Sequence, residues 1–437
     1  MSVFNHSLFR FLFVLLFITG LTSGSLAQQP SEIDLTHNTQ IQKEFIQFNP
    51  EYIQMKAQRV ARIRELHSKV SELEAAGAST TCSHQILWEI KALITQTADF
   101  KLLDRRLIDL DSNLAHPIHE NITMIMDSLT GNWANCFDQW FCKLSSFCEE
   151  IGREENKNSP LKFQPHFLDQ INSPEKLTNY LMTVSLSDIP KTGTDNLLEF
   201  NLSLTNLMRL ILRDRPKGYN WDPKLKTTLT DLVFKHFRNP ETGWWGESYV
   251  RDGHVQFVDD LSTTFHIVTY LKGDVPDLQR VVSTTLAVKD LNYPVGWLWN
   301  GEYWNHNNMD VVALFKAGWQ HADKNQKKAI STEIQKMLDW CLSKSLQADG
   351  SFKPHIADGS LEEGVYYGVS FLGRIGFFDK SERFWTNQSF KNAAVIRRKI
   401  TEYILRHSDT GGSGGSYYES ALSDYLNYKP DKNDRNK

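Results

Sequence analysis

The stretch Gly-Trp-Trp-Gly-Glu at residues 243–247 decides the fold, because variants of it return further along the chain. Residues 296–302 read Gly-Trp-Leu-Trp-Asn-Gly-Glu, and residues 349–352 read Asp-Gly-Ser-Phe, so that successive copies begin 53 residues apart. A looser glycine-rich copy begins 62 residues after the third, at Gly411. A repeat of this length indicates one supersecondary unit that is stacked several times.

Apolar residues with helical spacing flank these Gly-aromatic turns. Ile330, Ile334 and Met337 precede the third turn at intervals of three and four, and Leu261 and Phe265 follow the first turn in the same way. Such spacing is typical of amphipathic helices, and sustained period-two alternation is absent on both sides. We therefore expect each unit to be a helix, a Gly-aromatic turn and a second helix, with strands limited to short hairpins.

The same helical spacing continues through residues 40–215, so the whole chain predicts an all-α fold without a large β domain. Stacked hairpins that bury their faces against neighbours favour an incomplete or closed α/α toroid of about five to seven hairpins. We expect one catalytic domain over 28–430, with N-terminal hairpins in 40–215 and the site in the repeat-bearing half, 216–430. Residues 431–437 are predicted to be a disordered tail.

Residues 1–27 are typical of an export signal. An unbroken apolar run at 11–18 follows Arg10, and Ser25-Leu26-Ala27 has the small-x-small pattern of a cleavage site. The apolar run is too short for a comfortable membrane span. We expect a secreted or periplasmic protein whose mature chain has no membrane span.

The net charge and the composition limit the classes of molecule that this protein is expected to bind. A formal charge of -4 over 437 residues, without a long basic run, gives no electrostatic footprint for nucleic acid. The 12 Trp, 14 Tyr and 25 Phe suit stacking on carbohydrate, although most such rings belong to a core. The oligomeric state has no signal in the sequence.

The five cysteines of an exported chain favour disulfides. Cys136, Cys142 and Cys148 cluster, Cys82 stands apart, and Cys341 lies on an apolar helical stripe. The simplest arrangement is two bridges among the first four, with Cys341 a buried free thiol. Their spacing fits no zinc pattern.

Polar residues near the second and third turns suit β-elimination from a uronic-acid sugar. Asn305-His306-Asn307-Asn308 forms an amide-rich run, and His355, Tyr366 and Tyr367 follow the third turn. An Asn amide donates hydrogen bonds to a carboxylate and so helps the neighbouring proton to leave. Histidine titrates near neutrality and suits the base, whereas a Tyr phenol suits the proton donor or, beside cations, the base.

These motifs resemble the chondroitin, hyaluronate and xanthan lyase family. In that family a catalytic His follows an Asp-Gly-Ser-aromatic turn, as His355 does here, and a catalytic Tyr precedes a Gly, as Tyr367 does. The family's catalytic Asn begins an Asn-x-x-Asp helix start, which Asn307 matches 48 residues before His355, and its Trp pair resembles 244–245. The resemblance covers roughly residues 240–378 and implies an α/α toroid that cleaves an anionic polysaccharide.

A second resemblance, to toroidal alginate lyases, covers the same segments. Those enzymes place an adjacent Asn-His pair here, matched by Asn305 and His306, and a Tyr on the following helix, matched by Tyr366 or Tyr367. The two patterns leave open which His and which Tyr act. About three more residues separate His355 from Tyr367 than in the chondroitin-type pattern.

The predicted substrate-binding residues are those that the turns and the following helix bring together, namely Trp244, Trp245, Trp297, Trp299 and Arg374. Arg397 and Arg398 are further candidates for the family's catalytic Arg. No cofactor is expected, since an amide can neutralise the carboxylate. Some lyases use Ca²⁺ for that purpose, but this sequence has no recognisable calcium site. The identity of the polysaccharide and the choice between internal and terminal cleavage stay open.

Two other functions fit the same fold class. An α/α-barrel glycoside hydrolase would use carboxylates such as Asp259, Asp310 or Glu247. The adjacent Asp259 and Asp260 diverge on a helix, so we interpret them as charges at a helix N-terminus. A non-catalytic glycan-binding toroid would need only the aromatic groove.

Overall fold

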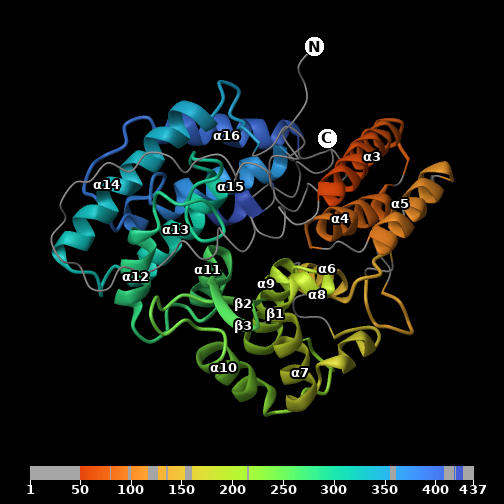
Figure 1. The fold of residues 1–437 in the computed structure, drawn as a ribbon. Coiled ribbons are helices and arrows are strands. Elements are labelled where there is room, and N and C mark those ends of the chain that lie inside the picture. The colour runs from red at the N-terminus through yellow and green to blue at the C-terminus, as the bar shows by residue number, and fades with distance from the viewer. Residues whose placement is uncertain are drawn as a thin grey trace. The chain divides into compact units, whose positions relative to one another are not determined.

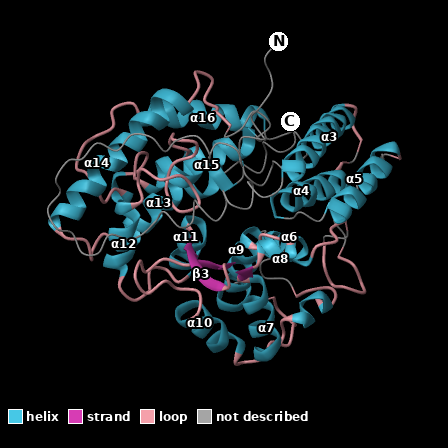
Figure 2. Cartoon of the chain, in the orientation of Figure 1, coloured by secondary structure: helices cyan, strands magenta, loops and turns pink. Residues whose placement is uncertain are grey.

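The computed structural model describes residues 50–78, 80–96, 100–116, 126–133, 136–152, 160–213, 216–354, 361–407, 418 and 420–426. This part of the chain is predominantly helical and has one small sheet (Figures 1 and 2). The prediction of a helical protein is confirmed in this coarse form, and closure into a toroid stays a prediction. The predicted export signal and the C-terminal tail lie outside the described residues.

The chain divides into two compact units. The first runs to Glu241 and also takes in Trp245–Asp259, whereas the second comprises Thr242–Trp244 and the residues from Asp260 onward. We had placed the start of the repeat-bearing half at residue 216, so the unit boundary lies later in the chain.

The first unit holds the helices α3 to α10. Their bounds are α3 Pro50–Ala75, α4 Thr81–Gln96, α5 Phe100–Ala115, α6 Trp140–Gly152, α7 Pro174–Val184, α8 Ile189–Thr192, α9 Leu197–Met208 and α10 Leu225–Lys235, with a 3-10 helix at His166–Gln170 and a π-helix at Arg209–Arg213. α3, α4 and α5 pack on one another through Leu66, Ile90 and Leu103, each almost fully buried. α9 packs against α4, α6 and α7.

One disulfide, Cys82–Cys136, joins the start of α4 to the segment before α6. The expected second bridge is wrong, because Cys142 and Cys148 are buried free thiols on α6. Six residues of helix correspond to a rise of about 9 Å, which exceeds the Cα separation that a disulfide tolerates. Cys341 is a buried free thiol, as predicted.

The sheet has the order β1-β2-β3 and belongs to the first unit. β1 (Leu186–Ser187) pairs in parallel with β2 (Gly246–Arg251), and β2 forms an antiparallel hairpin with β3 (His254–Asp259). The hairpin turns at Asp252 and Gly253, which both have positive φ, 49° and 76°. A two-residue Asp-Gly loop favours this conformation because its twist matches that of the strands.

The second unit holds the helices α11 to α16. Their bounds are α11 Leu261–Tyr270, α12 Leu278–Ala287, α13 Asn305–Gly318, α14 Lys324–Trp340, α15 Leu361–Arg374 and α16 Ala393–His407, with π-helices η4 Cys341–Ser345 and η6 Ala421–Tyr425 and a 3-10 helix at Lys380–Glu382. α13 packs against α11 and α15, and α12 packs against α13 and α14 (Figure 1). η6 packs on α15. Alternate helices of the repeat are therefore neighbours, as stacked hairpins require.

Three Gly-aromatic turns are each closed by an isolated β-bridge to the residues that follow the preceding helix. The pairs are Arg238–Trp245 and Leu346–Phe352, which are antiparallel, and Asn292–Leu298, which is parallel. The second turn connects α12 to α13 directly, as predicted, whereas the hairpin β2–β3 is inserted after the first. The repeat is therefore a structural one, with an insertion in its first copy.

Two glycines let the third turn pack tightly. Gly350 has φ 99°, and a Cβ there would lie 2.4 Å from the carbonyl oxygen of Lys399. A Cβ at Gly368 on α15 would lie 2.3 Å from the ring of Phe352, which is fully buried. The Tyr-Gly pair at 367–368 thus lets α15 lie directly on the turn aromatic.

Candidate functional site

The first turn of α13 carries the amide-rich run. Asn307 is fully buried and donates from Nδ2 to the carbonyl oxygen of Trp297 at 2.8 Å. Asn305 is 3 % exposed and donates from Nδ2 to Ser345 Oγ at 2.9 Å. These amides fasten α13 to the turn before it and to η4. The structure thus gives Asn305 and Asn307 a packing role, and their contact with a substrate carboxylate stays a prediction.

His306 and Tyr367 form a stacked pair. Their ring centroids lie 4.0 Å apart with an interplanar angle of 12°, although one residue comes from α13 and the other from α15. Trp304 meets His306 edge-on, with centroids 4.7 Å apart. The His306 side chain keeps 24 % of its surface exposed, and Tyr367 is half-buried. The structure therefore brings an imidazole and a phenol together at a position that solvent reaches.

Arg374 lies two helical turns after Tyr367 on the same face of α15. Its guanidinium lies over the rings of Phe265 and Tyr425, at 5.6 Å and 5.9 Å from their centroids. Its Nε is buried without a hydrogen-bond partner, and Arg374 makes no ion pair with any described residue. A half-buried cation that lacks a counter-charge is suited to receive an anion.

Asp310 lies one turn after His306 on α13 and is fully buried. Its Oδ2 lies 3.8 Å from His306 Nε2, and neither carboxyl oxygen has a hydrogen-bond partner in the described part of the chain. Burial raises the pKa of Asp310 well above its usual value, with Asp260 adding to this effect and Arg374 opposing it.

The two histidines near Arg374 are held neutral. Burial, with a smaller contribution from His266, lowers the pKa of His306 to about 3. Burial and then the charge of Arg374 lower the pKa of His266 to about 4. Burial thus disfavours the charged forms of both imidazoles and of Asp310, whereas no described residue forms an ion pair with Arg374.

Tyr366 differs from Tyr367 in its surroundings. Its ring lies 5.3 Å from that of Tyr367 and 6.5 Å from that of Tyr425. Burial, and next the neighbouring Tyr425, raise the pKa of Tyr366 to about 12. Tyr367, which stacks on His306, is thus the better placed of the two tyrosines to exchange a proton with a substrate.

The predicted tryptophan platform needs correction. Trp244, Trp245 and Trp297 are fully buried, so none of them presents a face to a substrate. Trp244 and Trp245 can both be buried although they are adjacent, because they do not lie on a helix. Residue 245 is bridged in extended backbone, where neighbouring side chains point in opposite directions.

Hydrogen bonds show into which unit the side chains of Trp244 and Trp245 pack. Trp244 Nε1 donates to the carbonyl oxygen of Val281 at 3.4 Å in the second unit. Trp245 Nε1 donates to that of Val233 at 2.8 Å in the first unit. Both tryptophans are therefore core residues of the unit to which they belong.

Half-buried aromatics lie instead beside the stacked pair. Trp299, which was predicted, lies edge-on to Trp304 with centroids 5.4 Å apart. Trp304 also approaches Tyr367, at 6.5 Å between centroids. These two indoles are the candidates for a sugar-binding face.

His355, the predicted base of the chondroitin-type pattern, lies outside the described residues. Its role stays a prediction. Of the residues in the alginate-type pattern, the structure brings His306 and Tyr367 together, and the pattern itself stays a prediction.

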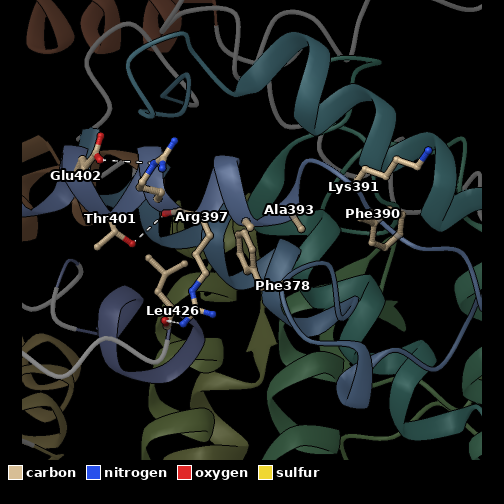
Figure 3. Close-up of a pocket in the computed structure, with 10 residues that line it drawn as sticks. Phe378, Phe390, Lys391, Ala393, Arg397, Thr401, Glu402 and Leu426 are labelled. Carbon is tan, nitrogen blue, oxygen red and sulfur yellow. Dashed lines mark hydrogen bonds and ion pairs between the residues drawn. The ribbon is translucent and has the colours of Figure 1, made fainter.

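Arg397 and Arg398 line a different pocket of about 520 Å³ (Figure 3). Arg397 is turned toward the carbonyl oxygen of Leu426 and donates to it, and Arg398 lies 3.9 Å from Glu402. Neither His306 nor Tyr367 lines this pocket. Of the three arginines considered, Arg374 is therefore the one that belongs to the candidate site.

The carboxylates of the hydrolase alternative have other partners. Glu247 is buried and accepts hydrogen bonds from Tyr249 and from Ser187 Oγ, the latter at 3.3 Å. Asp259 accepts from Asn239 Nδ2 at 3.2 Å. Asp260 caps α11 by accepting from the Thr263 amide at 2.5 Å, in line with our interpretation of it as a helix N-terminal charge.

Sequence reasoning missed three contributors to the site. His266 received no role from the sequence, although the charge of Arg374 acts on it and it acts on His306. Trp304 was passed over, although it directly precedes the Asn-His pair. Asp310 was considered only as a hydrolase carboxylate. Its position four residues after His306 was the available signal, because that spacing puts both side chains on one helix face.

The comparisons with known proteins add no relative. Neither the family models nor the curated proteins nor the solved structures match this chain. Within the described ranges, no helix has the length and apolarity to cross a membrane. The same ranges contain no group of three or more His, Cys, Asp or Glu that could hold a metal ion.

Proposed function

We propose that this protein is a polysaccharide lyase that cleaves a uronic-acid-containing polysaccharide by β-elimination. The observation that carries the proposal is the stack of His306 on Tyr367 at 4.0 Å, at a partly exposed position. Arg374, on the same face of α15 as Tyr367, supports it because no described residue forms an ion pair with its guanidinium. An imidazole, a phenol and a cation supply the three groups that the elimination needs.

In the proposed reaction Arg374 binds the carboxylate of the uronate and stabilises the negative charge that spreads onto it. His306 takes the C5 proton, and the electrons of that C–H bond form the C4–C5 double bond. The C4–O bond breaks, and the leaving oxygen takes a proton from the Tyr367 hydroxyl. Water then returns a proton to Tyr367 and takes one from His306.

The low pKa of His306 fits this sequence once substrate is bound. In the free protein, burial favours the neutral imidazole. A carboxylate beside the ring favours the charged form and raises the pKa again. His306 therefore becomes an effective base only when the anionic substrate is present, which suppresses proton uptake from water in the empty site.

The remaining expectations belong to this proposal. Trp299 and Trp304 supply the face on which sugars stack, in place of the buried tryptophans. The stacked hairpins of the second unit support an α/α toroid, whose closure depends on the whole chain. The Cys82–Cys136 disulfide supports a secreted or periplasmic location.

A glycan-binding protein without catalysis is the second candidate. The observation that favours it is the half-buried Trp299–Trp304 pair, because exposed indoles bind sugars whether or not chemistry follows. A glycoside hydrolase is less well supported, since Glu247 and Asp259 already have hydrogen-bond partners.

The test is a screen of purified protein against alginate, glucuronan, chondroitin, hyaluronan and xanthan. A lyase produces an unsaturated uronide, which is followed by its ultraviolet absorbance. New reducing ends without that absorbance would indicate a hydrolase instead. Binding without any new ends, measured by calorimetry, would favour the glycan-binding candidate and contradict the lyase.

A further inference from the structure

Asp310 has an environment that an ionised carboxylate does not tolerate. It is fully buried, and neither of its oxygens accepts a hydrogen bond from any described residue. Arg374 is close enough to act on its charge but does not form an ion pair with it. A buried carboxylate without donors is strongly disfavoured, and the protonated acid is the form that such a position favours.

The other groups around Asp310 do not compensate a negative charge. On α13 itself the nearest titratable group is His306, which is neutral, and on α11 they are Asp260 and the neutral His266. α15 contributes Arg374. The charges on the helices that cover α13 from the other side are paired elsewhere: Arg280 with Asp277, and Glu333 with Lys289 and Lys336.

We propose that Asp310 is a positioning residue that works as a neutral acid: protonated, it leaves the charge of Arg374 to a ligand carboxylate, and ionised, it takes that charge for itself. The inference rests on the proposed function for the identity of the ligand. The state of the carboxyl group itself does not depend on that function. Asp310 thereby makes the site selective for anions and sets an upper pH limit for binding them.

The Oδ2–Nε2 distance of 3.8 Å gives Asp310 a second effect. This separation is longer than a hydrogen bond, but catalytic contacts are often long in the empty site and shorten around substrate. A protonated carboxyl that closes this gap accepts the Nε2–H of His306 through its carbonyl oxygen, which fixes the ring against Tyr367 and leaves Nδ1 as the nitrogen that takes a proton.

The first arm of the test measures the carboxyl group directly. Protein labelled with ¹³C at the aspartate carboxyl is titrated by NMR, and the Asp310 signal is assigned by its loss in Asp310→Asn. Burial also raises the pKa of Asp195. The Asp195→Asn variant therefore identifies the Asp195 signal, which also titrates at high pH, and keeps it from being mistaken for that of Asp310. We expect Asp310 to ionise well above the unperturbed pKa of an aspartate, because burial disfavours its charged form. Ionisation near that unperturbed value would overturn the proposal, whatever the enzyme does.

The second arm uses sodium D-glucuronate as the probe, with its methyl ester as the uncharged control, and measures binding by NMR line shifts between pH 5 and 10. In wild-type protein, glucuronate binding should weaken as Asp310 ionises, and ester binding should not. In Asp310→Asn, whose amide reproduces the neutral acid, the alkaline loss should disappear. Asp339→Asn, which removes an exposed carboxylate from α14, should leave the wild-type profile unchanged.

The two arms distinguish failure of the proposal for Asp310 from failure of the proposed lyase function. If Asp310→Asn loses glucuronate binding at the same pH as wild type, the proposal is overturned. If Asp310→Asn does not fold, the ¹³C titration of the wild-type protein tests the proposal. The Asp195→Asn variant then shows which of the signals that titrate at high pH belongs to Asp195, so that the other is assigned to Asp310. If no polymer is cleaved but the carboxyl proves neutral and glucuronate binding follows its ionisation, the lyase is lost and the role of Asp310 stands.

Discussion

Each unit contains a fully buried acid, Glu247 in the first and Asp310 in the second, but the two differ in how their oxygens are satisfied. In the first unit the Tyr249 hydroxyl reaches both Glu247 Oε1 and the half-buried Asp195, at 2.8 Å from Oδ1. Asp195 also accepts from the Leu197 amide and Glu247 from Ser187. In the second unit the oxygens of Asp310 accept no hydrogen bond from a described residue.

The difference separates a structural cluster from a candidate site. The Tyr249 hydroxyl has only one hydrogen to donate, so at least one of Asp195 and Glu247 must itself be protonated to hydrogen-bond with it. Each of these groups then has a hydrogen-bond partner within the network. Such a network holds β2 to the segment before α9. Buried polar groups without partners are costly and uncommon, and in folded proteins they concentrate where a ligand supplies the missing contacts. The comparison therefore predicts stability effects in the first unit and activity effects in the second.

The largest expected effect comes from Tyr367→Phe, which removes one hydroxyl from the stacked pair. Turnover of the cleaved polymer should fall by roughly two to four orders of magnitude, because proton transfer to the leaving oxygen is lost. KM should change little, since the hydroxyl acts in the transition state. Tyr366→Phe is the matched control and should stay within about tenfold of wild type. If Tyr366→Phe is inactive and Tyr367→Phe is not, the assignment of roles is reversed.

Arg374→Gln should have the next largest effect. It removes a charge that forms no ion pair with a described residue and that we propose binds the substrate carboxylate, so kcat/KM should fall by about 10²–10³. The loss should be smaller at high salt, where the charge of Arg374 is already screened. Arg397→Gln, on the wall of the separate pocket, serves as the control. Equal losses for both variants would mean that activity depends on the net charge of the protein and that Arg374 does not contact the substrate.

Tyr249→Phe should act on stability and leave the chemistry alone. It removes the donor that Asp195 and Glu247 share, at a cost of about 1–3 kcal/mol in the free energy of unfolding. Urea denaturation measures this loss. Tyr303→Phe, whose hydroxyl lies 3.5 Å from Glu333 at a half-buried position, should cost less. A drop in turnover without a change in stability would place the first cluster in the site and break the comparison.

The smallest effect is expected for Trp304→Ala on substrate binding. An aromatic stacking contact contributes about 0.5–1.5 kcal/mol, so KM should rise by roughly two- to twelvefold with kcat preserved. Trp88→Ala, at an indole of the first unit that is 39 % exposed, is the control. A fall in kcat with unchanged KM would show instead that Trp304 acts through His306, against which its ring lies.

The repeat was predictable because its turns leave marks in the sequence. A glycine followed within two residues by a buried aromatic, as at Gly243, Gly296 and Gly350, recurs with a fixed period, and the period alone indicated stacked helical hairpins. The hairpin in the first copy also had a mark, the Asp252-Gly253 pair, which the helical spacing around it led us to pass over. The boundary between the two units left no signal in the sequence, because it depends on which core Trp244 and Trp245 each enter.

The candidate site was predictable in part. The Asn-His pair and the Tyr before Gly pointed to the two residues that stack. The roles of the asparagines were not predictable, because they follow from the carbonyl of Trp297 and the hydroxyl of Ser345, which only packing brings near. Sequence likewise carried no sign that Asp310 would be buried without donors.

The contact between Gly368 and Phe352 has a consequence for how the site responds to its surroundings. The spacing of α15 is set here by atoms in van der Waals contact, with neither charge nor hydrogen bond between them. Such a contact does not weaken with salt or with proton concentration. The distance between Tyr367 and His306 should therefore stay constant across conditions that change every charge nearby, so that acid, alkali and salt alter the reactivity of the pair and leave its geometry in place.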